Sequence, residues 1–142
     1  MKIKIINKSG YDLPEYKTKG SAGCDLHAVL EYPKKLLPLD RVTIPTGIYL
    51  ALPTGYEAQV RPRSGLAAKF GVTAILGTID ADYRGEIKTI LVNLSNEDYT
   101  VQPGERIAQL VIIPFVKALF SECENLSDTV RGSDGFGSTG VK

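Results

Sequence analysis

The chain has 142 residues, enough for one domain that buries most of the surface its unfolded form exposes. Its 17 Lys+Arg and 16 Asp+Glu residues nearly cancel, so it lacks the global positive field that holds proteins on nucleic acid, and we expect no nucleic-acid partner. Residues 1–7 alternate charged and apolar side chains, which argues against a signal peptide or membrane span and predicts a cytoplasmic protein without a membrane partner.

Short apolar stretches separated by turn signals predict β-strands along most of the chain. The apolar positions are Ile3/Ile5, Val42/Ile44, Ile48/Leu50, Ala58/Val60 and the runs 87–94 and 107–116. The turn signals, which combine proline, glycine and polar residues, stand at 45–47, 53–55, 83–85 and 102–105. This regular spacing favours an all-β sandwich or barrel.

Two other segments differ from this pattern. Residues 64–70 contain good helix formers and predict a helix of one or two turns, with Ser64 as its N-cap. Residues 131–140 contain four glycines and almost nothing apolar, so burial cannot offset the entropy lost on ordering. We therefore predict one β domain over residues 1–130 and a flexible arm over residues 131–142.

Conventional catalytic constellations are missing from the sequence. His27 is the only histidine, so a histidine metal cluster is excluded, and the patterns GxSxG, HExxH and GxxxxGK[ST] do not occur. Asp25 and His27 would share one face of a strand, but no nucleophile accompanies them. A structural or solvent-exposed role for His27 is favoured.

Residues 61–65, Arg-Pro-Arg-Ser-Gly, have the composition of an anion site. Two guanidinium groups lie two residues apart, just before the predicted helix. Forked donors, a hydroxyl and oriented backbone N–H groups suit a phosphate. Surface arginines paired with carboxylates would explain the same residues, and the segment alone does not decide between the two.

Residues 77–86 contain two carboxylates, Asp80 and Asp82, that would face the same side of an extended segment. Tyr83 follows at a turn that opens a long apolar strand. In such a pair, one carboxylate can act as a base towards a water molecule, and the other can bind a cation or a structural partner. Acidic residues are common in ordinary hairpin turns, and for this segment in isolation that interpretation is favoured over a catalytic one.

The tail has one aromatic residue, Phe136, whose ring would be wasted in a flexible arm unless it covers a flat group such as a base. Arg131, Ser138 and Thr139 add a cation and two hydroxyls, and the glycines let backbone N–H groups approach an anion. A tail without a role is the alternative.

Taken in order, these segments resemble the five motifs of trimeric dUTP pyrophosphatases. The matching segments are residues 21–26, 61–67, 77–86, 106–110 and 131–140. The resemblance spans nearly the whole chain. It implies a jelly-roll-like β-barrel, a homotrimer with active sites shared between subunits, and hydrolysis of dUTP to dUMP and pyrophosphate. The glycine-rich arm would then close over a site formed by neighbouring subunits.

The resemblance also implies roles for individual residues. Asp80 matches the catalytic aspartate that activates water for attack on the α-phosphorus, and Tyr83 matches the tyrosine that packs on the deoxyribose and rejects UTP. Residues around the uracil correspond to Ala74, Gly77, Thr78, Ile79, Asp80 and Lys88. Phosphate contacts correspond to Arg63, Ser64, Gly65 and Gln109. In the arm, Arg131, Gly137, Ser138 and Thr139 match the phosphate side, and Phe136 matches the ring that stacks on uracil.

Asp25 matches the aspartate that holds the hydration shell of Mg²⁺, with the metal itself bound mainly by the triphosphate. Magnesium sheds water reluctantly, and this arrangement agrees with that property. A deaminase acting on dCTP shares the implied fold, but it lacks the Asp-x-x-Tyr-Arg-Gly hairpin and the glycine-rich arm. A non-catalytic nucleotide-binding module is the second alternative.

Overall fold

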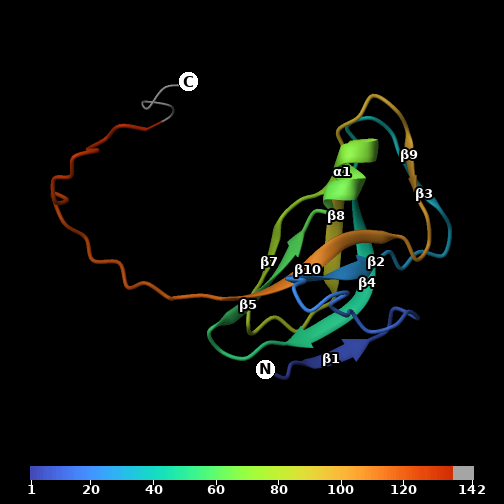
Figure 1. Cartoon of the computed structure of the whole chain (residues 1–142), viewed down its shortest axis with the longest axis horizontal. Helices are drawn as coiled ribbons and strands as arrows, with labels where there is room; N and C mark the ends of the chain where they lie inside the picture. The colour runs from blue at the N-terminus through green and yellow to red at the C-terminus, as the bar shows by residue number, and fades with distance from the viewer. Residues whose placement is uncertain (136–142) are drawn as a thin grey trace.

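The structure is a computed structural model that describes residues 1–135, so the predicted site residues Phe136, Gly137, Ser138 and Thr139 lie outside the described residues. The described part is built mainly from strands with one short helix (Figure 1). The strands are β1 (Lys4–Asn7), β2 (Gly23–His27), β3 (Lys34–Leu36), β4 (Arg41–Ala51), β5 (Tyr56–Arg61), β6 (Val72–Ala74), β7 (Gly77–Ile79), β8 (Ile87–Asn93), β9 (Tyr99–Val101) and β10 (Arg106–Pro114), and the helix is α1 (Ser64–Phe70).

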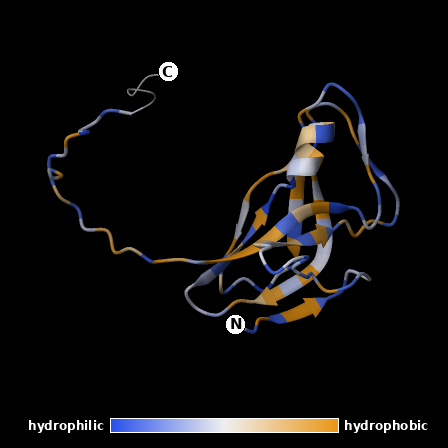
Figure 2. Ribbon diagram, in the orientation of Figure 1, coloured by the Kyte–Doolittle hydropathy of each residue, from blue (hydrophilic) through white to orange (hydrophobic). Residues whose placement is uncertain are grey.

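Two four-stranded sheets enclose the core. One has the order β1-β4-β8-β6 and the other β2-β10-β5-β7, while β3 and β9 form a two-stranded ribbon. Every pairing is antiparallel. Buried and less buried residues alternate along β2, β5 and β8, so one face of each of these strands lies on the core. Figure 2 shows hydrophobic and hydrophilic residues interspersed along the strands. This arrangement confirms the predicted jelly-roll-like β fold.

Strand β4 corrects one sequence-based expectation. Residues 45–47 were expected to form a turn between two strands, yet β4 continues through them. The register against β8 shifts between Pro45 and Ile48, so the segment is a bulge. Gly47 adopts a φ of 67°, and a Cβ there would lie 2.5 Å from the backbone of Ser9. The glycine at position 47 is therefore needed because β4 passes close to the backbone of Ser9.

Helix α1 has the predicted bounds but a different cap. Arg63 is the N-cap residue, in an extended conformation, and Ser64 is the first residue of the helix. The Arg63 carbonyl accepts hydrogen bonds from the N–H groups of Leu66 and Ala67, both at 3.1 Å. The helix ends at Gly71, which has a left-handed conformation. The short strands β3, β6, β7 and β9 were not predicted, because three residues are too few to show an alternation.

The packed body ends just after β10. The Phe115 N–H donates to the Gly55 carbonyl at 2.9 Å, and residues 116–134 beyond it are all exposed. Figure 1 shows this segment running away from the sheets. It includes five large apolar side chains that are almost fully exposed, namely Val116, Leu119, Phe120, Leu126 and Val130. Among residues 1–135, none of the helices is long and apolar enough to cross a membrane.

Candidate active site

An ion-pair cluster joins β2, β10 and the residue that caps α1. The Arg63 Nε lies 3.0 Å from the Asp25 Oδ1, and the Arg106 Nη1 lies 3.2 Å from the Asp25 Oδ2. The Arg63 Nη1 also donates to the Arg106 carbonyl at 2.7 Å. Two guanidinium groups on one carboxylate leave the cluster with a net positive charge, which suits a phosphate.

The sheet and the helix bring three more of the predicted phosphate residues, Ser64, Gly65 and Gln109, to the side of this cluster. Gln109 on β10 is the cross-strand partner of Asp25 on β2. Ser64 and Gly65 begin α1 directly after Arg63, and both are exposed. The structure therefore unites Asp25, Arg63, Ser64, Gly65 and Gln109 on one side of the molecule. It adds Arg106, for which neither the sequence pattern nor the resemblance implies an individual role.

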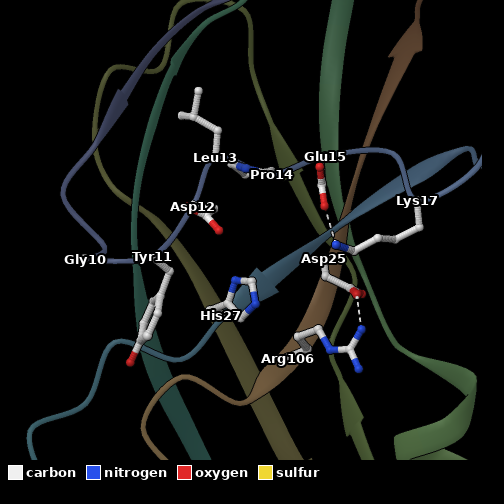
Figure 3. A pocket seen from close by; sticks show the side chains of 10 residues that line it. All are labelled: Gly10, Tyr11, Asp12, Leu13, Pro14, Glu15, Lys17, Asp25, His27 and Arg106. Carbon is white, nitrogen blue, oxygen red and sulfur yellow. Dashed lines mark hydrogen bonds and ion pairs between the residues drawn. The ribbon is translucent and has the colours of Figure 1, made fainter.

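A hollow of about 370 Å³ lies beside the cluster, between it and residues 10–17 (Figure 3). Asp25, His27 and Arg106 form one wall, and the His27 ring lies with its centroid 5.3 Å from that of Tyr11. Burial lowers the pKa of His27, and the nearby Arg106, Lys17 and Arg63 lower it further, while Asp25 acts in the opposite direction. His27 is half-buried and packs on the N-terminal loop.

The acidic segment lies on the other edge of the same sheet. Strand β7 pairs with β5, with Thr78 opposite Gln59, and the chain then turns so that the Tyr83 N–H donates to the Asp80 carbonyl at 3.1 Å. Asp80 and Asp82 therefore belong to a turn and not to the expected extended segment. Both line a second hollow, separate from the one beside Asp25, and Asp80 and Tyr83 are exposed.

The turn is fixed by hydrogen bonds to main-chain carbonyls. The Tyr83 hydroxyl donates to the Glu86 carbonyl at 3.1 Å, and the Arg84 Nη1 donates to the carbonyls of Ala81 and Tyr83 at 2.7 and 2.8 Å. These contacts fix the turn without using the Asp80 carboxylate. The turn thus exposes a carboxylate and an aromatic ring three residues apart.

Most of the predicted uracil residues lie on β7 and β8, the two strands that this turn connects. Gly77, Thr78 and Ile79 make up β7 itself, Ala74 is buried at the end of β6, and Lys88 is exposed on β8. The Ile75 N–H donates to the Ile90 carbonyl at 2.8 Å and ties the β6–β7 connection to β8. The predicted uracil residues therefore come from three strands, β6, β7 and β8.

A second hollow, of about 620 Å³, lies beside Asp80. It is lined by Thr54, Gly55, Glu57, Asp80, Ala81, Asp82, Phe115 and Lys117. The start of the exposed C-terminal segment therefore passes close to the proposed base.

Within one chain the two halves of the site lie apart. Asp25 and Asp80 belong to the opposite edges of the sheet β2-β10-β5-β7, and the register places them four residues apart along the strands. Ordinary strand spacings then separate them by about 20 Å. Arg131 is exposed, with its Nε donating to the Asp134 carbonyl at 2.8 Å, and it contacts neither half.

Comparison with known proteins identifies the family. The dUTPase family profile matches residues 10–140. A deoxyuridine 5'-triphosphate nucleotidohydrolase of Finegoldia magna is 55% identical over 99% of both chains. The enzyme of that name from Cytophaga hutchinsonii is 56% identical over 97% of this chain and 91% of its own.

A solved structure supports the same assignment. The dUTPase of Staphylococcus bacteriophage 80alpha with dUPNHPP superposes with a TM-score of 0.90 at 27% identity, over 99% of both chains. The match covers both halves of the site described above. The chain belongs to the dUTPase family.

Proposed function

We propose that this protein hydrolyses dUTP to dUMP and pyrophosphate by water attack on the α-phosphorus. The observation that carries the proposal is the β7–β8 turn, which exposes both Asp80 and Tyr83 and leaves the Asp80 carboxylate without a hydrogen-bond or ion-pair partner among residues 1–135. The family supplies the substrate class, and the cationic cluster supplies a partner for a triphosphate. The reaction removes dUTP from the nucleotide pool and yields dUMP for thymidylate synthesis.

Each half of the site has its own task. Asp80 takes the proton of the attacking water, and Tyr83 packs on the deoxyribose so that a 2′-hydroxyl has no room. General-base help is worth about 10²–10⁴-fold, so positioning and charge stabilisation supply most of the remaining acceleration. That part belongs to the phosphate contacts, namely Arg63, Ser64, Gly65, Gln109 and, from the arm, Arg131, Gly137, Ser138 and Thr139. Phe136 would stack on uracil.

The residues present fit a hydrated Mg²⁺ bound chiefly by the substrate. Residues 1–135 contain no cluster of three or more His, Cys, Asp or Glu side chains that could hold a metal. Asp25 pairs with Arg63 and Arg106 through one contact on each oxygen, so each oxygen keeps a further acceptor position for metal-bound waters. A bound Mg²⁺ would neutralise charge on the triphosphate as pyrophosphate leaves.

A homotrimer with shared sites would reconcile the separation of Asp25 from Asp80. If Asp25, Arg63 and Gln109 of one subunit face Asp80 and Tyr83 of another, the distance of about 20 Å within a chain is no obstacle. The exposed apolar side chains of residues 116–130 are also typical of a segment that packs on another subunit.

Pyrophosphate release tests this proposal. The protein is incubated with dUTP, UTP, dCTP and dTTP, with Mg²⁺ and with EDTA. We expect release from dUTP alone, and a strong loss on chelation. Ammonia from dCTP would instead identify a deaminase, and binding of dUTP without turnover of any nucleotide would identify a non-catalytic module.

A further inference from the structure

Arg106 reaches the phosphate side of the site because of an irregularity in β10. In a regular strand, residues three apart point to opposite faces, so Arg106 and Gln109 should not share one. The register shows otherwise. Arg106 pairs with His27 and Ala108 with Leu26, so two steps along β10 match one step along β2. The extra residue is Ile107.

The burial pattern confirms which residue is extra. Ile107 and Ala108 are consecutive, yet both are fully buried in the core, whereas Gln109 is half-buried on the outer face. A bulge at Ile107 therefore turns Arg106 outward, onto the face that holds Asp25 (Figure 3). Bulges next to active sites commonly re-aim a side chain in this way.

The outward position gives Arg106 a specific contact. The Arg106 Nη1 pairs with the Asp25 Oδ2, while the Arg63 Nε pairs with the Asp25 Oδ1. If the Oδ2 were free, the carboxylate could accept the Arg63 guanidinium in a bidentate fork, the geometry that arginine and carboxylate favour. That fork would occupy the N–H groups that Arg63 needs for a phosphate.

We propose that Arg106 is a positioning residue for the triphosphate. It occupies one oxygen of Asp25 and thereby keeps part of the Arg63 guanidinium available to the substrate. The inference rests on the proposed function, because it assumes that Arg63 binds a phosphate of dUTP. It adds a residue and a backbone device to that function, namely the bulge at Ile107.

The test compares ligands with and without the terminal phosphates. Affinities for non-hydrolysable dUpNHpp and for dUMP are measured by calorimetry with Mg²⁺ present, for the wild type and for Arg106→Gln. We expect about a tenfold loss for dUpNHpp, the size of one charge-assisted hydrogen bond, and less than about a twofold loss for dUMP. Arg41→Gln, an exposed arginine in the other sheet, is the control for the change in charge.

A double variant then tests whether Arg106 acts through Asp25. In an Asp25→Asn background no bidentate fork can form, so adding Arg106→Gln should cost less than about twofold in dUpNHpp affinity. Arg106→Lys, which can still hold one carboxylate oxygen, should return affinity to within about threefold of the wild type. If thermal unfolding shows that Arg106→Gln is less stable than the wild type, the comparison of Arg106→Lys with the wild type still tests the role of the cation.

Three results would overturn the assignment. The first is that Arg106→Gln binds dUpNHpp as tightly as Arg41→Gln does. The second is that the fold-losses in dUpNHpp affinity of Asp25→Asn and Arg106→Gln multiply in the double variant. The third is that Arg106→Lys binds dUpNHpp as weakly as Arg106→Gln. A wild-type protein that neither binds dUpNHpp nor hydrolyses dUTP would contradict the proposed function itself, so the two failures are distinguishable.

Discussion

The Tyr83 ring lies against Gly85 so closely that a Cβ on the glycine would stand 2.3 Å from the Tyr83 hydroxyl oxygen. The hydroxyl passes over this position to donate to the Glu86 carbonyl. The orientation of the proposed sugar-packing ring thus depends on a missing side chain two residues away.

Gly85→Ala should therefore displace Tyr83 while leaving the core intact. We expect kcat/KM for dUTP to fall by about tenfold or more and the preference for dUTP over UTP to narrow, because a 1 Å misplacement can cost that much. Pyrophosphate release with both nucleotides measures it. Gly20→Ala, where an added Cβ meets nothing within 4 Å, is the control. Unchanged discrimination in Gly85→Ala would show that the ring does not select the sugar.

Asp80→Asn should separate turnover from binding. Asp80 is exposed and its carbonyl, not its side chain, closes the turn, so the fold should persist. We expect turnover to fall by about 10²–10⁴-fold with dUpNHpp affinity within a few-fold of wild type. Asp98→Asn, a surface carboxylate paired with Lys35, is the control. Turnover within a few-fold of wild type would remove Asp80 from the role of base.

Truncation after Val130 should abolish most activity without unfolding the body. The body ends at Phe115, and residues 116–134 are exposed, so the removed residues hold no core side chain of the described part. We expect an unchanged midpoint of thermal unfolding and about a hundredfold or greater loss of pyrophosphate release, because the predicted lid is gone. A lowered unfolding midpoint would instead assign the arm a structural role.

Thr89 on β8 offers a test of stability. Its side chain is fully buried, and its Oγ1 has no hydrogen-bond partner within residues 1–135. Thr89→Val keeps the shape and removes an unpaired hydroxyl, so it should stabilise the protein by about 1 kcal/mol. Thr46→Val is the matched comparison, because the buried Thr46 hydroxyl donates to the Ile87 carbonyl and its loss should destabilise by a similar amount. Thermal unfolding of both variants measures the effects.

Tyr99 should make stability fall at alkaline pH. Burial, together with a hydrogen bond to the Glu105 carboxylate, raises the pKa of Tyr99 well above its ordinary value of about 10. The unfolded chain therefore loses this proton first, so the contribution of Tyr99 is complete below about pH 10 and declines as pH rises towards the folded pKa.

A comparison with Tyr99→Phe isolates that contribution. The difference in unfolding free energy between wild type and variant should shrink between about pH 9 and about pH 11, since all other titrating groups are shared. Urea unfolding at both pH values measures it. A difference that stays constant would show that Tyr99 titrates alike in the folded and unfolded chains.

Local sequence rules predicted the long elements and failed where distant segments meet. The apolar runs that became β8 and β10, and the bounds of α1, follow from periodicity and helix propensity. The passage of β4 through Pro45 and Gly47 does not, because it depends on the approach of Ser9. The resemblance to a family gave Asp25 and Arg63 related roles, but their direct ion pair joins residues that no local pattern connects.

Arg106 illustrates the same limit within the site. Strict alternation along β10 would place it in the core, and only the pairing with β2 reveals the extra residue at Ile107. The two adjacent apolar residues, Ile107 and Ala108, are the signal that sequence reasoning could have used. Two consecutive apolar residues next to a charged residue, in a strand that otherwise alternates, predict a β-bulge.

If the exposed apolar side chains of residues 116–130 pack on other subunits, the activity of the protein depends on its concentration in the cell. If three chains must meet before a site is complete, a newly made copy contributes no activity until it finds two others. At low expression, activity would then rise with about the third power of chain concentration, and dilution would lower activity per chain. Residues 116–130 would then make the activity per chain depend on how much protein the cell produces.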